Sequence, residues 1–123
     1  MRLLFILCAG FGLGAIVCAI QYVLIRLGRF RRNPFLGVAT SVTRESDEIW
    51  TRAHEAAAPW IGRAGILAAL ASVIAGVGLV VGGGVEATDG FSIASGIVGA
   101  GAAATFMIGA EGAARREVER RGS

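Results

Sequence analysis

His54 is the only histidine in the chain, and three carboxylates, Asp47, Glu48 and Glu55, lie near it in the sequence. The unperturbed pKa of histidine lies near neutrality, so this group has the residue types of a proton relay or a metal site. One histidine with scattered carboxylates is nevertheless a weak metal pattern, because metal sites gather several ligands at fixed spacing. We therefore interpret His54 as a side chain that hydrogen-bonds within a loop, and we expect no bound metal.

The two cysteines, Cys8 and Cys18, form no catalytic pattern. Both lie inside a long apolar run without a nearby histidine or carboxylate, so each is interpreted as a small apolar helix residue. The sequence shows no nucleophile–base pair, no phosphate-binding glycine loop and no paired carboxylates. We expect no catalytic residue, no cofactor and no enzymatic activity. An enzyme acting on lipids is the least favoured hypothesis, and a transporter acting alone is not favoured because the apolar runs lack charges.

Three apolar runs dominate the chain, at Leu3 to Ile25, Ala64 to Val85 and Phe91 to Ala110. Each is about 20 residues or longer, the length at which a helix rising 1.5 Å per residue crosses a bilayer. The runs do not alternate apolar with polar residues as barrel strands do. Since 54% of the 123 residues are hydrophobic, the chain has more apolar surface than one soluble core of this size buries. We predict an all-α integral membrane protein.

The predicted architecture is a single membrane domain, 1–123, with three transmembrane helices and one amphipathic interfacial helix. The transmembrane helices are expected at about 3–27, 60–84 and 91–111. The connecting segments are expected to be a cytoplasmic loop at 28–59 that carries the amphipathic helix at about 43–58, an outer turn at 85–90 and a cytoplasmic tail at 112–123.

The amphipathic helix has apolar residues at three- and four-residue spacing from Ile49 to Trp60. Thr43 or Ser46 can cap its N-terminus, and Glu48 and Arg52 form a favourable i,i+4 pair. We expect this helix to lie along the membrane interface. The indoles of Trp50 and Trp60 then sit at headgroup depth, and Pro59 falls in the first turn of the next helix.

A cleaved signal peptide is the alternative interpretation of the first run. The run is too long for a signal core, and its end at Gln21-Tyr22-Val23 lacks a small-x-small cleavage site. Its positive charges also follow the run instead of preceding it, apart from Arg2. We therefore expect a retained membrane anchor.

Arginine placement predicts the orientation, because positive residues favour cytoplasmic loops. All 12 basic residues are Arg, and all of them except Arg2 lie in the tail or in the segment between the first and second runs, at 26–63. The only charged residues in the link between the second and third runs are Glu86 and Asp89. Three crossings put the loop and the tail on one side. We expect a multi-pass protein of the bacterial inner membrane, with the N-terminus outside and the C-terminus cytoplasmic. The arginines then face lipid headgroups, with no nucleic-acid partner. The expected interface anchors are Arg29, Arg31, Arg32, Trp60 and Arg63.

Small residues four apart recur in all three runs and are typical of close helix packing in membranes. The candidate packing residues are Gly10, Gly14, Gly78, Gly82, Gly96, Gly99 and Ala103. Two interpretations stay open: packing among the three helices of one chain, or self-association and docking onto another membrane protein.

The polar segment between the first and second runs carries a longer motif. It has Asn, Gly, Thr, Ser, Glu, Trp and His at defined spacing, at Asn33, Gly37, Thr40, Thr43, Ser46, Glu48, Trp50 and His54. These positions match, without a gap, the signature of the SdpI-type family, which this chain resembles over Arg31 to about Gly78. That family comprises bacterial membrane proteins named for immunity to a sporulation-delaying toxin. The resemblance is to a short form, without the additional crossings and N-terminal domain of larger members.

The chain departs from the family pattern at Ala39, Ser41 and Ala53, where the family has Arg, Pro and Thr. If the family arginine takes part in activity, this chain has lost or relocated it, and Arg44 is a possible substitute. The resemblance implies a membrane protein that acts by binding, through immunity to or sensing of a membrane-active toxin, with the motif loop as its distinguishing surface. The alternative is an accessory subunit that docks onto a larger membrane assembly. The expected partners are membrane lipids and either another membrane protein or a second copy.

Overall fold

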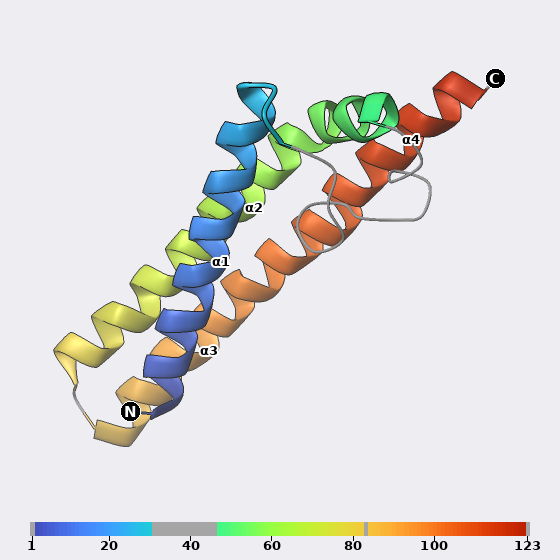
Figure 1. Cartoon of the computed structure of the whole chain (residues 1–123). Helices are drawn as coiled ribbons and strands as arrows, with labels where there is room; N and C mark the ends of the chain where they lie inside the picture. The colour runs from blue at the N-terminus through green and yellow to red at the C-terminus, as the bar shows by residue number, and fades with distance from the viewer. Residues whose placement is uncertain (1, 31–46, 83, 123) are drawn as a thin grey trace.

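The described part of the chain is an all-α bundle. A computed structural model describes residues 2–30, 47–82 and 84–122, except for the side chains of 84–87 and 121–122, and these residues contain no strand. The helices are α1 Arg2–Arg26, α2 Asp47–Val81, α3 Gly84–Ala104, the π-helix η1 Thr105–Ala110 and α4 Glu111–Gly122. α3, η1 and α4 follow one another without a break, so the bundle has three long helical rods (Figure 1).

Each rod is long and apolar enough to cross a membrane. The candidate spans are Arg2–Arg26, Asp47–Val81 and Thr88–Arg120, with mean hydropathies of 2.6, 2.5 and 1.7 over their most apolar stretches. Large aliphatic side chains such as Ile16, Val73 and Ile97 are exposed along all three. In lipid these side chains contact an apolar solvent, whereas a water-soluble protein of this size would have to bury them. The predicted all-α membrane protein with three spanning helices is confirmed.

The two ends of the bundle differ in charge. The end of α1, the beginning of α2 and α4 lie together at one end, and the N-terminus and the α2–α3 turn lie at the other (Figure 1). We call the first of these the arginine end. Its described basic residues are Arg26, Arg29, Arg52, Arg63, Arg115, Arg116, Arg120 and Arg121.

α1 ends in a glycine turn. Gly28 has a φ of 69°, its N–H donates to Ile25 O at 3.1 Å, and the N–H of Arg29 donates to Leu24 O at 2.8 Å. This pair of bonds is a Schellman motif, which satisfies the last carbonyls of a helix and needs the left-handed conformation that glycine adopts without strain. The turn directs Phe30 back against the bundle, where it is buried.

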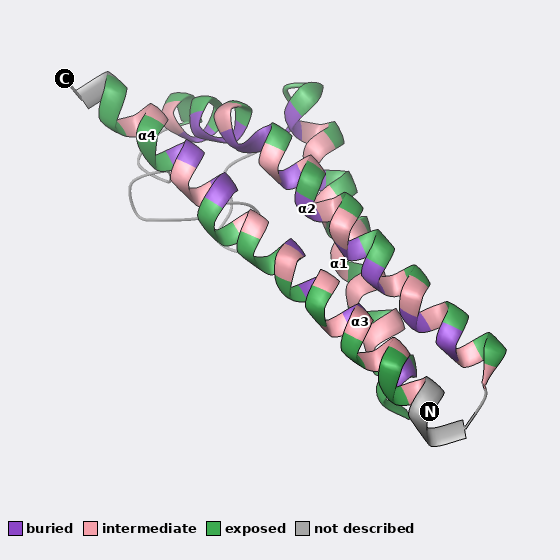
Figure 2. Ribbon diagram, turned by 180° about the vertical axis from the view of Figure 1, so that it is seen from behind, coloured by how far each residue is buried: buried purple, intermediate pink, exposed green. Residues whose placement is uncertain are grey.

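α2 contains the described part, 47–58, of the predicted amphipathic helix and the transmembrane helix predicted at 60–84 as far as Val81, whereas 43–46 lie outside the described residues. The break expected at Pro59 is not there, because Pro59 lies inside the helix instead of in its first turn. Proline removes one backbone hydrogen bond and bends a helix without always ending it. The ribbon of α2 changes direction between its first turns and its membrane part (Figures 1 and 2). At 35 residues α2 is about 52 Å long, so its first turns extend beyond roughly 30 Å of hydrocarbon.

The predicted outer turn and tail also differ from the structure. Residues 85–90, expected as a turn, belong to the first turns of α3, which begins at Gly84, so only 82–83 separate α2 from α3, and Gly82 has a φ of 66°. Residues 112–122, expected as a tail, continue the third rod as α4. α4 stays helical because it packs against the extension of α2 and because its charged residues can face away from that contact.

α2 is the central helix and contacts both neighbours through small residues. Its membrane part buries one stripe at three- and four-residue spacing, made of Ala64, Ala68, Ala71, Ala75 and Gly78 (Figure 2). Side chains this small let the backbones approach closely, which is how helices gain dispersion contacts in lipid.

Two serines add hydrogen bonds between the rods. Ser72 Oγ on α2 donates to Cys8 O on α1, and Ser95 Oγ on α3 donates to Ala71 O on α2, both at 2.8 Å. Ser95 is completely buried. A hydroxyl inside a membrane bundle needs such a partner, so these bonds also fix the register of the rods.

Candidate functional site

The motif found in the sequence is described only in its second half. Asn33, Gly37, Thr40, Thr43 and Ser46 lie outside the described residues, as do the predicted anchors Arg31 and Arg32. Glu48, Trp50 and His54 lie on the first turns of α2, at the arginine end.

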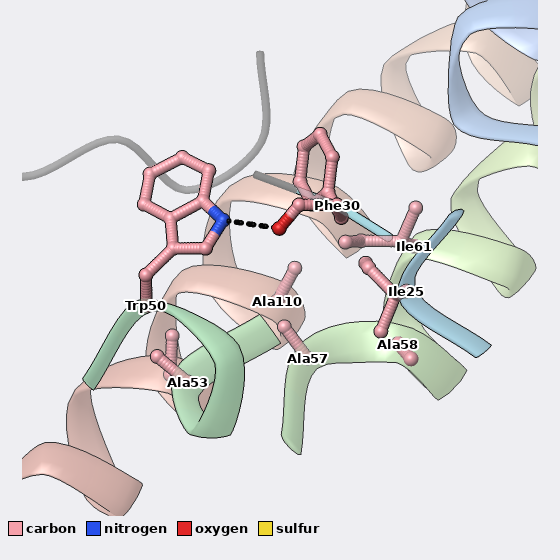
Figure 3. Close-up of a cluster of buried hydrophobic side chains, with 9 residues drawn as sticks. Ile25, Phe30, Trp50, Ala53, Ala57, Ala58, Ile61 and Ala110 are labelled. Atoms are coloured by element: carbon pink, nitrogen blue, oxygen red, sulfur yellow. Dashed lines mark hydrogen bonds between the residues drawn. The ribbon is translucent and has the colours of Figure 1, made fainter. Parts of the chain in front are cut away.

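Trp50 is buried against other parts of the protein, whereas the prediction of an interfacial helix placed its indole among lipid headgroups. It is 1% exposed, and its Nε1–H donates to the backbone oxygen of Phe30 at 2.9 Å (Figure 3). Ala110 and Ala114, on the third rod, belong to the same buried cluster. The prediction treated the first turns of α2 as a lone amphipathic helix on lipid; the third rod and Phe30 cover its apolar face instead.

His54 completes this aromatic cluster. Its ring centroid lies 4.1 Å from that of Trp50 and 5.0 Å from that of Phe30, and the ring is 1% exposed. Its Nδ1–H donates to Trp50 O at 2.8 Å, because a carbonyl can only accept. About 20 residues of α2, counted back from Val81, are enough to cross the hydrocarbon, so His54 lies on the part of the helix beyond it. Burial lowers the pKa of His54, and the hydrogen bond to Trp50 O offsets part of that effect.

The sequence favours a structural role for His54 over one as a metal ligand. Among the described residues no group of three His, Cys, Asp or Glu can hold a metal. His54 instead hydrogen-bonds to the backbone of its own helix, one turn back. Its role in the described structure is to fill the space between Phe30 and Trp50.

Glu48 differs from the other two motif residues because it is exposed. Its Oε1 lies 3.9 Å from Arg52 Nε, the i,i+4 pair that the sequence predicts. Both side chains are at least half exposed, so water and salt screen the pair and it contributes little stability. Glu48 presents a charge at the arginine end, whereas Trp50 and His54 hold the helix in place.

We call Phe30, Trp50 and His54 the clamp. The clamp joins Phe30, just past the glycine turn that ends α1, to the first turns of α2, 20 positions later in the sequence. The segment that carries the first half of the motif starts and ends at this clamp. The second half of the motif therefore positions the two ends of that segment at the arginine end.

The predicted packing glycines divide into two groups. A Cβ added at Gly78 would lie 2.7 Å from Phe91 Cβ and 3.2 Å from Leu4 Cδ1, and one added at Gly99 would overlap the ring of Phe11. These two glycines therefore permit close contacts between the rods.

The other predicted packing positions make no such contact. A Cβ at Gly10, Gly14, Gly82 or Gly96 would meet nothing within 4 Å, and Ala103 is exposed. Gly82 serves the turn through its positive φ. Gly10 and Gly14 therefore pack against no other rod among the described residues.

The structure describes three of the predicted membrane anchors, Arg29, Trp60 and Arg63. Arg29 is exposed. Trp60 is partly buried, and a Cβ at Gly109 of η1 would overlap its indole. The Arg63 guanidinium lies 4.7 Å from the indole centroid, within cation–π range. Trp60 is thus held between a glycine of the π-helix and an arginine.

Two features of this region were missed in the sequence. Phe30 was treated only as part of the cytoplasmic loop at 28–59, although its backbone oxygen accepts the hydrogen bond of Trp50 and its ring packs on His54. Ala110 and Ala114, four apart in a segment interpreted as membrane edge and tail, contact the clamp side of α2. The signal was the i,i+4 spacing of these alanines, which continues the helical period past the predicted end of the third span.

The fold and the buried clamp define the class: a three-span helical membrane protein in which Phe30 and Trp50, on either side of the loop segment in the sequence, are hydrogen-bonded to each other. Comparison with known families agrees. Residues 29–111 match the model of the SdpI/YfhL protein family, which is more than half of the 123 residues, and the chain belongs to this family. The resemblance inferred from the motif is thereby confirmed. No curated protein and no solved structure matches the chain.

Proposed function

We propose that this SdpI-family membrane protein acts by binding, and that it confers immunity to, or senses, a membrane-active toxin. Family membership supports an immunity-type role. The observation that carries the proposal is the clamp: the motif residues Trp50 and His54 hold the first turns of α2 against Phe30, which precedes the motif segment. With Trp50 and His54 in this structural role, the first half of the motif is the proposed recognition surface, and the proposal includes no catalytic or cofactor-dependent step.

The proposed setting is the bacterial inner membrane, with the N-terminus outside and the arginine end in the cytoplasm. The grouping of the α1 end, the α2 start and α4 at one end of the bundle supports this orientation (Figure 1). Positive residues at that end favour the cytoplasmic side. Reporter fusions test it: a C-terminal green fluorescent protein should fluoresce and a C-terminal alkaline phosphatase should stay inactive. The reverse result would overturn the orientation.

The toxin role is tested by deletion and complementation. A strain lacking the protein is challenged with purified membrane-depolarising peptides, and membrane potential is followed with a voltage-sensitive dye. The deletion strain should depolarise at lower peptide concentration than the parent, and the wild-type gene should restore the parent's behaviour. Equal sensitivity of the two strains across the peptide panel would refute immunity.

The clamp gives this experiment a matched pair of variants. Trp50→Phe keeps an aromatic ring but removes the Nε1–H that Phe30 O accepts, whereas Trp60→Phe makes the same change outside the clamp. Trp50→Phe should complement less well than Trp60→Phe at equal expression in the membrane. Equal complementation by the two variants would mean that the clamp does not support the activity.

A second candidate function is that of an accessory subunit in a larger membrane assembly. Gly10 and Gly14 favour it, because they form a small-residue notch on a lipid-facing side of α1 that nothing in the described chain fills. Purification in mild detergent should then recover a stoichiometric membrane partner. Gly10→Leu with Gly14→Leu should release that partner, and Gly101→Leu, at another open position, should not. Recovery of the chain alone would count against this function.

A further inference from the structure

A groove of about 690 Å³ lies between α1 and α2. Its volume falls within the range of about 300–1,000 Å³ that small-molecule sites occupy. The two helices touch along its floor, where a Cβ at Gly65 would lie 2.9 Å from Cys18 Cβ and one at Gly62 would lie 3.3 Å from the Tyr22 ring.

Small and aliphatic side chains form the rest of the groove. Ala15 and Ala19 of α1 face Ala69 of α2, and the exposed side chains of Ile16 and Ile66 also line it. Alanines on both helices leave room that longer side chains would fill. The result is an apolar channel that opens sideways into the hydrocarbon, so its surroundings supply lipid chains rather than water.

Two guanidinium groups stand at one end of this apolar groove. Arg26, from the last turn of α1, and Arg63, from α2 just beyond Pro59, both line it, and both belong to the arginine end. Arg26 Nε donates to Tyr22 Oη at 3.2 Å, with the guanidinium 5.3 Å from the ring centroid. Arg63 lies over Trp60 at 4.7 Å. Aromatic contacts thus hold both cations in place.

The charge pattern of the groove matches one kind of molecule. Guanidinium groups bind phosphate through paired, charge-assisted hydrogen bonds. Basic pockets between transmembrane helices recognise anionic headgroups on this principle. Within the described residues neither Arg26 nor Arg63 has a carboxylate within ion-pair distance, so no ion pair there neutralises either charge. A peptide helix would fill the space between the apolar walls, but it would match the two cations that line the groove only if it carried acidic residues at the same depth.

We propose that this groove binds one anionic glycerophospholipid, with an acyl chain between α1 and α2 and its phosphate bound by Arg26 and Arg63. The site is independent of the toxin-related function and of the notch at Gly10 and Gly14, because it lies on other residues of α1. Because Arg26 and Arg63 belong to the arginine end, the bound lipid comes from the leaflet at that end of the bundle.

Native mass spectrometry of the full chain in mild detergent tests the proposal, with phosphatidylglycerol and phosphatidylcholine as probes. The wild type should retain one phosphatidylglycerol in preference to phosphatidylcholine. Arg26→Gln with Arg63→Gln should weaken phosphatidylglycerol binding by about tenfold or more, because charge-assisted hydrogen bonds are lost. Arg115→Gln with Arg116→Gln removes the same charge from α4, outside the groove, and should leave binding unchanged.

A second variant tests the acyl-chain part of the site. Ala69→Leu fills the groove and should reduce binding of both lipids, whereas Ala100→Leu adds equal bulk to an exposed position on α3 and should not. Circular dichroism establishes that each variant keeps its helical content. Equal loss of phosphatidylglycerol in the Arg115/Arg116 variant would show diffuse charge attraction and overturn the site. Equal retention of the two lipids, or a lipid-free dimer with a second copy in the groove, would overturn it as well.

Discussion

The two halves of α2 are held to the bundle by different means. From Trp50 to Ile61 the helix buries large rings and aliphatic side chains against Phe30 and the third rod. From Ala64 to Gly78 it buries almost nothing larger than alanine, and hydrogen bonds from Ser72 and Ser95 join it to its neighbours.

The difference follows from the solvent around each half. Where water reaches the protein, removing a large apolar side chain from it is strongly favourable, so rings make effective contacts. In hydrocarbon there is no such driving force between helices, and association depends on close packing and on polar groups that need partners. One continuous helix therefore uses the rules of a soluble core at its start and those of a membrane interface further on.

Truncating the clamp should have the largest effect on stability. Trp50→Ala removes a buried indole and should lower the free energy of unfolding by about 3–5 kcal/mol, the cost of deleting a large aromatic side chain from a core. Trp60→Ala removes the same side chain from a partly buried position and should cost less. Thermal unfolding in detergent measures both. An equal loss for the two variants would mean that the arginine end is not held by a soluble-type core.

Overpacking the membrane half should come next. Gly99→Leu drives a side chain into the Phe11 ring between the first and third rods, and such overpacking costs about 1–3 kcal/mol. Gly101→Leu, two residues on, adds the same side chain at a position where a Cβ meets nothing, and shares the gain in helix propensity. The difference in melting temperature between the two variants isolates the close contact. If Gly99→Leu is as stable as Gly101→Leu, the rods do not pack as tightly as the structure has them.

The three spans were predictable because each apolar run is long and uninterrupted, and a helix in lipid needs little else. The ends were not. At Pro59 the local pattern indicates a helix start, yet Ala57 and Ala58 before the proline and Ile61 after it are buried in one cluster with Ala110 of the third rod, which keeps the helix going on both sides. Residues 112–122 are polar enough to suggest a tail, and α4 forms only because the extension of α2 covers its alanines. Such tertiary contacts join segments far apart in the sequence, where a local window cannot detect them.

The same limit applies to the site. The identity of Trp50 and His54 as motif residues could be taken from the spacing of the motif, but not their burial, because the partner that covers them is Phe30, 20 residues earlier. The pair Glu48–Arg52 was predictable because it is local to one helix face. The groove at Arg26 and Arg63 was not, since it exists only where α1 and α2 are side by side.

A smaller effect is expected for the interhelical hydroxyls. Ser95→Ala removes the hydrogen bond to Ala71 O, and such bonds in membrane bundles contribute about 0.6 kcal/mol on average. Ser92→Ala is the matched control, because Ser92 Oγ donates to Thr88 O within its own helix and joins no two rods. Reversible unfolding in mixed micelles resolves differences of this size. A loss in Ser92→Ala as large as in Ser95→Ala would show that the bond between helices has no special role.

The smallest expected effect is the pH dependence of the clamp. Because burial lowers the pKa of His54 in the folded state, the unfolded state binds the proton more readily, and folding favours the neutral ring. The contribution of His54 is therefore fully present above the unfolded pKa of about 6.5 and is lost as pH falls from there through the lowered folded pKa. His54→Asn keeps an N–H donor near Trp50 O but does not titrate, so the wild type should lose more stability than this variant between pH 7 and pH 5. Parallel stability curves for the two proteins would mean that His54 does not titrate differently in the folded and unfolded states, and that the clamp is not closed to water as its burial implies.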